Sequence, residues 1–272
     1  MELEKPKKRE PKEVELLKPH TSFSQISSFL DCPMVYYFRW IEQLKIPPPS
    51  AMVLGTDYHK AIAYNFQQKI TTGIDVPEDE VLDVFNDAWE NDSKYAIFPA
   101  LGKPSDVKDS GYRVLQKHYH LKQITTQPMF AEKDYRVEFP DFPYDLVGKM
   151  DLVTDKGEIV DHKLRRTRPQ AWEAEDSLQL SLYGLGYRRL TDKKENKLVL
   201  EIGLRQKTPD IVEVSAPPIN EERCDTLSRI IGYTMNQIEY CKERGIFLPN
   251  RRATFCSPNG CGFWYQCHKV WR

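Results

Sequence analysis

Two apolar segments separated by a short polar turn dominate the hydrophobic pattern between residues 145 and 164. Residues 145–154 and 158–164 are rich in Val, Leu and Ile, which favour β-strands. Between them, Gly157 can adopt the left-handed conformation that a three-residue hairpin loop requires. The pattern therefore predicts an antiparallel β-hairpin in this part of the chain.

Helical and strand patterns alternate along the rest of the chain. Helices are predicted over residues 22–44, 50–69, 78–95, 106–124, 170–190 and 219–244, with a break or a new helix start at Pro33. Further strands are predicted over residues 130–139, 198–205 and 211–214. This order predicts an α/β fold with a mixed central β-sheet flanked by helices and a helical region at the N-terminus.

The composition is that of a soluble globular protein. The chain has 272 residues, of which 40% are hydrophobic and 29% charged, enough for one substantial core. Residues 1–19 alternate in charge and contain three prolines, which predicts a mobile charged tail before a single domain over residues 20–272. Because no apolar run approaches the roughly 20 residues that cross a bilayer and no secretory signal is present, we expect a cytoplasmic protein without a membrane partner.

The overall charge is nearly balanced. The 39 basic and 40 acidic residues give a net charge of −1, which excludes a polycation that coats DNA indiscriminately. Contact with nucleic acid would therefore need a local basic patch, for which Arg165, Arg166 and Arg168, just past the hairpin, are candidates. Two arginine pairs are further candidates: Arg188 with Arg189, and Arg251 with Arg252.

Each strand of the predicted hairpin carries an acid, and the second strand adds a lysine. A three-residue loop places Asp151 opposite Asp161, with Cβ atoms about 5 Å apart, close enough for the carboxylates to share a cation. Lys163 projects from the same face as Asp161. A two-residue loop would instead place Asp151 opposite His162. The non-functional alternative is that these three charged residues form the polar face of an ordinary hairpin. Two acids beside a lysine indicate a divalent-metal site for cutting phosphodiesters.

Three of the six cysteines are clustered near the C-terminus. Cys256, Cys261 and Cys267 form a Cys-x4-Cys-x5-Cys pattern, and in a cytosolic chain such clustering indicates a metal site rather than a disulfide. Cys32 is our choice for the fourth ligand, which would connect the two ends of the domain. The spacing favours an iron–sulfur cluster over zinc, and zinc with His268 as a spare ligand is the alternative.

Several motifs together carry a family resemblance. In chain order they are SFSQISSFLDCP, GTDYHKAI, GKMDLV, IVDHKL, QLSLY and the three terminal cysteines. The chain resembles the RecB-type branch of the PD-(D/E)XK nuclease superfamily, in particular the CRISPR-associated and AddB-like exonucleases that contain a four-iron four-sulfur cluster. The order and rough spacing of the motifs are more specific than any one of them alone.

The resemblance assigns roles to individual residues. It implies that Asp151 and Asp161 bind Mg²⁺ or Mn²⁺, that Lys163 is catalytic, and that His59 joins the metal shell. Three further positions match family motifs: Gln179 and Tyr183 in Gln-x3-Tyr, and Glu132 as an additional acid. Two departures stand out. The terminal cysteines are spaced more widely than Cys-x2-Cys-x5-Cys, and His162 occupies a position that is usually apolar, so its side chain should point away from the metal.

The resemblance also implies an activity. We expect a metal-dependent DNA exonuclease that hydrolyses phosphodiester bonds in single-stranded DNA or at duplex ends, in recombination, repair or CRISPR-type DNA processing. The alternative from a different functional class is a noncatalytic DNA-binding or adaptor protein that retains the nuclease fold.

Overall fold

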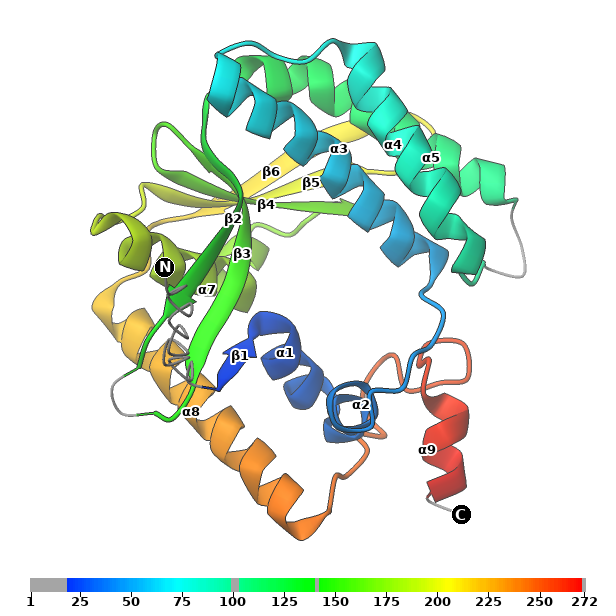
Figure 1. Ribbon diagram of the computed structural model, residues 1–272, viewed down its shortest axis with the longest axis vertical. Helices are drawn as coiled ribbons and strands as arrows, with labels where there is room; N and C mark the ends of the chain where they lie inside the picture. Colours follow the sequence, from blue (N-terminus) through cyan, green and yellow to red (C-terminus); the bar gives the residue numbers. More distant parts are fainter. Residues whose placement is uncertain (1–18, 99–102, 140–141, 271–272) are drawn as a thin grey trace, which may run out of the picture.

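A mixed β-sheet forms the centre of the fold in the computed structural model, which describes residues 19–98, 103–139 and 142–270 (Figure 1). Its strands are β1 His20–Ser22, β2 Pro128–Val137, β3 Asp145–Thr154, β4 Glu158–Arg165, β5 Lys197–Leu204 and β6 Asp210–Ala216. The strand order is β1-β3-β4-β5-β6, and β2 pairs with the other edge of β3. The β1–β3 and β4–β5 pairs are parallel and the others antiparallel.

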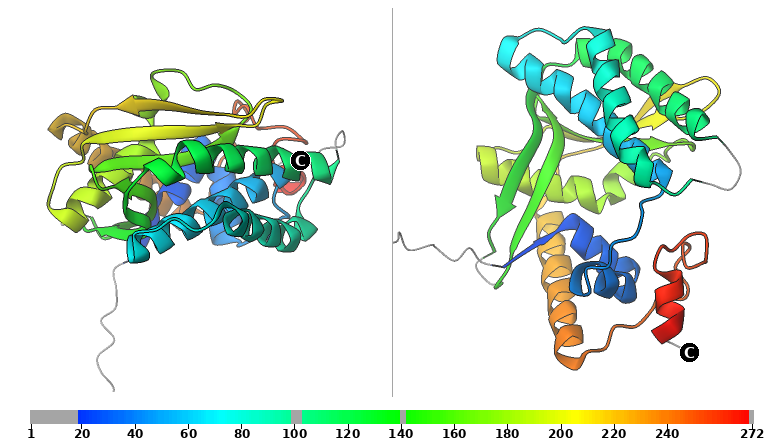
Figure 2. Two further views of the ribbon diagram at one scale, coloured as in Figure 1. Left: turned by 90° about the horizontal axis from the view of Figure 1, so that it is seen from above. Right: turned by 45° about the vertical axis from the view of Figure 1, so that its right-hand side comes forward.

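Helices cover both faces of this sheet. They are α1 Phe23–Asp31, α2 Pro33–Tyr36, the π-helix η1 Tyr37–Ile41, α3 Ser50–Thr72, α4 Glu78–Asp92, the 3₁₀ turn η2 Ser93–Tyr95, α5 Pro104–Leu121, the 3₁₀ turn η3 Gln123–Thr125, α6 Glu173–Asp176, α7 Leu178–Thr191, α8 Glu221–Arg244 and α9 Trp264–Val270. The helices α3, α4 and α5 form one group, while α1 and α8 lie away from it (Figures 1 and 2). The fold class predicted from the sequence is confirmed.

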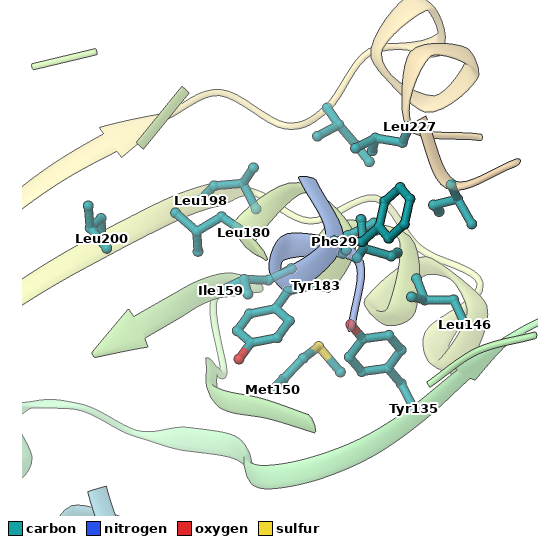
Figure 3. Packing of buried hydrophobic residues seen from close by; sticks show 14 of the residues in the cluster. Phe29, Tyr135, Leu146, Met150, Ile159, Leu180, Tyr183, Leu198, Leu200 and Leu227 are labelled. Atoms are coloured by element: carbon teal, nitrogen blue, oxygen red, sulfur yellow. The ribbon is translucent and has the colours of Figure 1, made fainter. Parts of the chain in front are cut away.

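Alternating strand residues divide the core into two clusters. Leu152, Val160 and Val199 face α3, α4 and α5. The neighbouring residues Val153 and Ile159 face the other cluster, which contains Met150 and Tyr183 and is closed by side chains of α1, α7 and α8 (Figure 3). Because successive strand residues point to opposite faces, Asp161 lies on the α7 side with Ile159, and His162 lies on the α3–α5 side with Val160.

The N-terminal helical region is broken where the sequence predicts. Ser22 caps α1 by accepting a hydrogen bond from the backbone N–H of Gln25. At Cys32 the backbone is extended, and Pro33 occupies the first turn of α2. The predicted helix over residues 170–190 differs from the observed chain: α6 and α7 are separate, because the backbone turns at Ser177 before Leu178 starts the longer helix.

The segment around α2 and the C-terminal segment that leads to α9 lie side by side (Figure 1). The backbone N–H of Asn250 donates to the Cys32 sulfur at 3.2 Å, and the Asn250 side chain donates to the Asp31 carbonyl at 2.9 Å. The predicted charged tail, residues 1–19, lies almost wholly outside the described residues, and the carbonyl of Pro19 accepts a hydrogen bond from the Asp145 backbone N–H at 3.0 Å. Among the helices that the structure describes, none is long and apolar enough to cross a membrane.

Candidate metal centre

The hairpin turn sets the register of the two acid-bearing strands. Gly157 has φ +74°, in the left-handed region. The pairing of Leu152 with Val160 agrees with the three-residue loop, and the same register sets Asp151 against Asp161. The ladder does not continue to the acids, however, because the backbone N–H of His162 donates to Asp151 Oδ2 at 3.0 Å. The first acid is therefore held where β3 and β4 begin to separate.

Asp161 is almost completely buried, with 1% of its surface exposed. Its Oδ1 accepts a hydrogen bond from Lys163 Nζ at 2.9 Å, whereas its Oδ2 is buried without a hydrogen-bond partner among the described residues. Burial raises the pKa of Asp161 to about 6; the Lys163 ammonium opposes this shift and the Asp151 carboxylate adds to it. A buried oxygen without a partner is costly, and a bound cation would satisfy it.

Three further ligand atoms gather beside the hairpin. Atoms of His59 on α3, Glu132 on β2 and Asp151 lie within 4.8 Å of one another, and His59 Nδ1 is 3.4 Å from Asp151 Oδ2. Glu132 has φ +49°, a left-handed conformation that is uncommon for a residue other than glycine and is often retained at functional sites. Carboxylate oxygens with one imidazole could hold Mg²⁺ or Mn²⁺. Asp161 is outside this three-residue group.

Gln179 and Tyr183 connect the two acids through a chain of hydrogen bonds. They stand four residues apart on α7, and Gln179 Nε2 donates to the Tyr183 hydroxyl at 2.8 Å. Lys163 Nζ donates to Gln179 Oε1 at 2.9 Å, and the Tyr183 hydroxyl donates to Asp151 Oδ1 at 3.1 Å. Burial and the nearby Asp151 raise the pKa of Tyr183, so its hydroxyl remains a donor. The chain from Asp161 through Lys163 to Asp151 fixes both acids and the lysine.

Two of the three arginines in the predicted basic patch form ion pairs with acidic side chains. Arg165 Nη1 lies 2.6 Å from Glu173 Oε2, and Arg168 Nη2 lies 2.7 Å from Asp210 Oδ2. Arg166 is exposed. These ion pairs offset two of the three positive charges, so a role of the patch in binding DNA stays a prediction.

The four predicted cysteine ligands line one cavity, which the apolar side chains of Phe38 and Phe263 help to enclose; they are Cys32, Cys256, Cys261 and Cys267. Among the described residues, no three thiols have sulfurs within 4.8 Å of one another. Around one tetrahedral zinc ion, with Zn–S bonds of about 2.3 Å, sulfurs would be about 3.8 Å apart. A cubane cluster uses a different iron for each thiolate, so its ligands stand further apart. Sulfurs further apart than in a zinc site are compatible with a cluster, and the choice between the cluster and zinc stays a prediction.

A buried ionic cluster lies under β4, on the face opposite Asp161. Glu201 Oε1 is 2.7 Å from His118 Nε2 and 2.8 Å from His162 Nδ1. Gln123 Nε2 is 3.0 Å from His118 Nδ1, and Lys122 Nζ is 4.0 Å from Glu201 Oε2. A nearby ammonium and an amide donor suit a hydrogen-bonded ion cluster rather than a second metal site. As expected, the His162 side chain points away from the two acids.

The hydrophobic pattern does not indicate this cluster, because its two histidines lie 39 and 83 residues from its glutamate in the chain. Its connection to the candidate site runs through one residue: His162 contacts Glu201 with its ring and Asp151 with its backbone N–H. A histidine between the motif acid and the motif lysine was the one available signal.

The affinity of the site for Mn²⁺ is expected to fall as the pH decreases through about 6. A carboxylate must be ionised to bind a cation, and the raised pKa of Asp161, about 6, means that metal must displace a proton at lower pH. Burial lowers the pKa of His59 to about 4, so its imidazole stays neutral in this range. Calorimetric titration of metal-free protein should show about tenfold weaker binding per pH unit below that point. Equal affinity for Mn²⁺ at about pH 5 and about pH 7 would contradict the assignment of Asp161 as a metal ligand.

Comparison with known proteins adds independent findings. The family model described as "PD-(D/E)XK nuclease superfamily" matches residues 20–268. The crystal structure of a "putative exonuclease" from Eubacterium rectale is similar over 92% of this chain and 93% of its own, with a TM-score of 0.59 and 14% identity, which bears on the fold alone. The crystal structure of SSO0001 matches over 67% of this chain and 74% of its own, with a TM-score of 0.32 and 13% identity. No curated protein matches.

Proposed function

Because the chain belongs to the PD-(D/E)XK nuclease superfamily, we propose that it is a metal-dependent DNA exonuclease that hydrolyses phosphodiester bonds in single-stranded DNA or at duplex ends. The observation that carries the proposal is the hydrogen-bonded chain Asp161–Lys163–Gln179–Tyr183–Asp151. It places a lysine between two acids, one of which has a buried oxygen without a partner in the part of the chain that the structure describes. A noncatalytic DNA-binding protein would have no need to fix these groups so closely.

Each side chain has a defined task in this proposal. Asp151, Asp161 and His59, with Glu132, hold Mg²⁺ or Mn²⁺. When bound, such an ion supplies a Lewis acid for the phosphate and lowers the pKa of a water. Lys163 uses two of its three N–H bonds on Asp161 and Gln179. The third can donate to a phosphate oxygen and stabilise the negative charge that grows in the transition state.

The proposed activity is tested with oligonucleotides labelled at the 5′ or the 3′ end. With Mg²⁺ or Mn²⁺, we expect stepwise shortening from an end, on single-stranded DNA or on duplexes, and no reaction in the presence of a chelator. Internal cuts alone would replace the exonuclease assignment with an endonuclease. Binding without any cleavage would favour the DNA-binding or adaptor alternative.

We also propose that the four-cysteine cavity holds a four-iron four-sulfur cluster. Its ligands come from both ends of the domain. Cys32 is buried, and its sulfur accepts a hydrogen bond from the backbone N–H of Asn250. Burial raises the pKa of Cys261 and of Cys267, so these thiols are more readily protonated in the absence of a metal that binds their thiolates. The cluster would thereby join the start of α2 to α9.

Replacing Cys32 with Ser is expected to remove the cluster. Anaerobically purified wild-type protein should contain about four irons per chain and absorb visible light, and the variant should lose most of both. Cys224→Ser is the matched control, because Cys224 lies on α8 beside Arg188 and outside the cavity. Zinc in place of iron in the wild type, or iron unchanged by Cys32→Ser, would contradict the assignment.

A further inference from the structure

Two cavities meet at the candidate site. The larger, of about 900 Å³, is lined by His59, Lys149 and Asp151 among others, and lies between α3 and the β2–β3 strands. The second, of about 640 Å³, lies beside the start of α7. Both include Lys163 and Leu164 in their linings, and the second also includes Asp161 and Gln179. A polymer with its scissile phosphate at Lys163 would therefore place one neighbouring nucleotide in each cavity.

The second cavity has an apolar wall that includes an exposed indole. Trp172 is 59% exposed and Leu30 is 49% exposed, and Phe23 and Leu178 complete this wall. The flat ring of a tryptophan in the same cavity as Lys163 offers a surface on which any nucleobase can stack, because every base has a π-face. Sequence reasoning did not identify Trp172, since it lies in a stretch that the pattern predicts as a continuous helix.

The charges around this cavity favour a neutral group over a phosphate. Its lining includes the acids Asp31, Glu173 and Asp176. The one arginine in the lining, Arg165, is paired through Nη1 with Glu173 at 2.6 Å, and its Nε and Nη2 are buried without a hydrogen-bond partner among the described residues. A phosphate entering this space would meet like charges, whereas a base carries none. A phosphate would thus be favoured at Lys163, which lines both cavities.

The backbone that carries Trp172 is held in place before any ligand arrives. The Glu173 side chain accepts hydrogen bonds from Arg165 and, at 2.7 Å, from the backbone N–H of Gln170. The backbone N–H of Asp176 donates to the Trp172 carbonyl at 3.0 Å. Arg165 therefore anchors the segment to the end of β4, and a side chain on a backbone that is already fixed has less entropy to lose on binding.

We propose that this cavity is a nucleobase subsite in which the base next to the scissile phosphate stacks on Trp172. The inference rests on the proposed nuclease function and adds the recognition of a base to it. Stacking is insensitive to base identity, so the subsite would recognise the presence of a base rather than a sequence.

The test measures binding separately from cleavage. Fluorescence anisotropy of a labelled single-stranded oligonucleotide is recorded with Ca²⁺ in place of Mg²⁺, because Ca²⁺ also takes oxygen ligands. Trp172→Ala should weaken binding about five- to a hundredfold, while Trp172→Phe should restore most of the affinity. Tyr233→Ala removes a similarly exposed aromatic ring on α8 and should leave binding unchanged.

A second arm uses oligonucleotides in which a single abasic residue is moved along the strand. At one position the abasic residue should weaken binding to the wild type and leave binding to Trp172→Ala unchanged, because the same contact is already lost. Affinities of wild type and Trp172→Ala within twofold on intact DNA would overturn the subsite. Binding that depends on Trp172 without cleavage in Mg²⁺ would instead retain the subsite and reject the nuclease proposal.

Discussion

Replacing Asp161 with Asn is expected to lower the rate of phosphodiester hydrolysis by at least about a thousandfold. The substitution leaves an oxygen to accept from Lys163 but removes the negative charge from the buried position that lacks a partner. Lys163→Met should have a comparable effect, because it removes the donor that contacts both Asp161 and Gln179. Initial rates on end-labelled DNA at saturating Mg²⁺ measure both changes.

Asp155→Asn is the matched control, because Asp155 is an exposed acid in the loop of the same hairpin. Its rate should stay within twofold of the wild type. Hydrolysis by Asp161→Asn or by Lys163→Met within tenfold of the wild type would contradict their assignment to the site.

We expect Asp161→Asn to lose activity without losing stability of the fold. Burial raises the pKa of Asp161 to about 6, above the value for an unfolded chain, so its contribution to stability is complete at low pH and is lost as the pH rises through about 6. At neutral pH the metal-free wild type therefore keeps an unfavourable buried charge, which Asn does not have. The metal-free variant should melt at the same temperature as the wild type or higher.

Replacing Glu201 with Gln is expected to lower the free energy of unfolding by about 3–5 kcal/mol. Burial alone would raise the pKa of Glu201, but His118 and His162 hold it well below its ordinary value. Gln keeps an oxygen that can accept from one imidazole, but it removes the negative charge that stabilises the buried cluster. Its depressed pKa means that Glu201 stabilises the fold above its unfolded pKa and loses this effect as the pH falls. The variant and the wild type should therefore differ less in acid.

Glu213→Gln provides the control for this prediction. Glu213 lies directly opposite Glu201 on β6 and also contacts Lys122, but its side chain is 39% exposed. An ion pair in such a position contributes about 1 kcal/mol or less. Urea unfolding near neutral pH should separate the two variants clearly. Equal stabilities for Glu201→Gln and Glu213→Gln would show that the buried cluster does not stabilise the fold.

The parts of the site that the sequence predicted are those fixed by local geometry. The turn at Gly157 sets the hairpin register, and the separation of four residues between Gln179 and Tyr183 sets a shared helix face. Spacing along one helix does not show which strand the helix packs against. The structure adds the hydrogen bonds that join them to Lys163 and Asp151.

Features that depend on distant partners could not be predicted. Glu173 and Asp210 offset the charge of two arginines in the predicted basic patch, and nothing in the pattern of either acid indicates this pairing. The three-residue strand β1 is too short to give a periodic signal, and its pairing with β3 spans more than a hundred residues. Trp172 lies directly before the short helix α6, which the sequence pattern does not separate from α7.

The central claim is that the oxygens of Asp151 and Asp161 bind one or two divalent cations next to Lys163. Anomalous diffraction from a crystal soaked in Mn²⁺ tests it most directly. We predict a peak about 2.1 Å from Asp161 Oδ2 and from an oxygen of Asp151, with His59 or Glu132 completing the ligand set. A soaked crystal that shows no peak near either aspartate, or a peak only at other acids, would contradict the account.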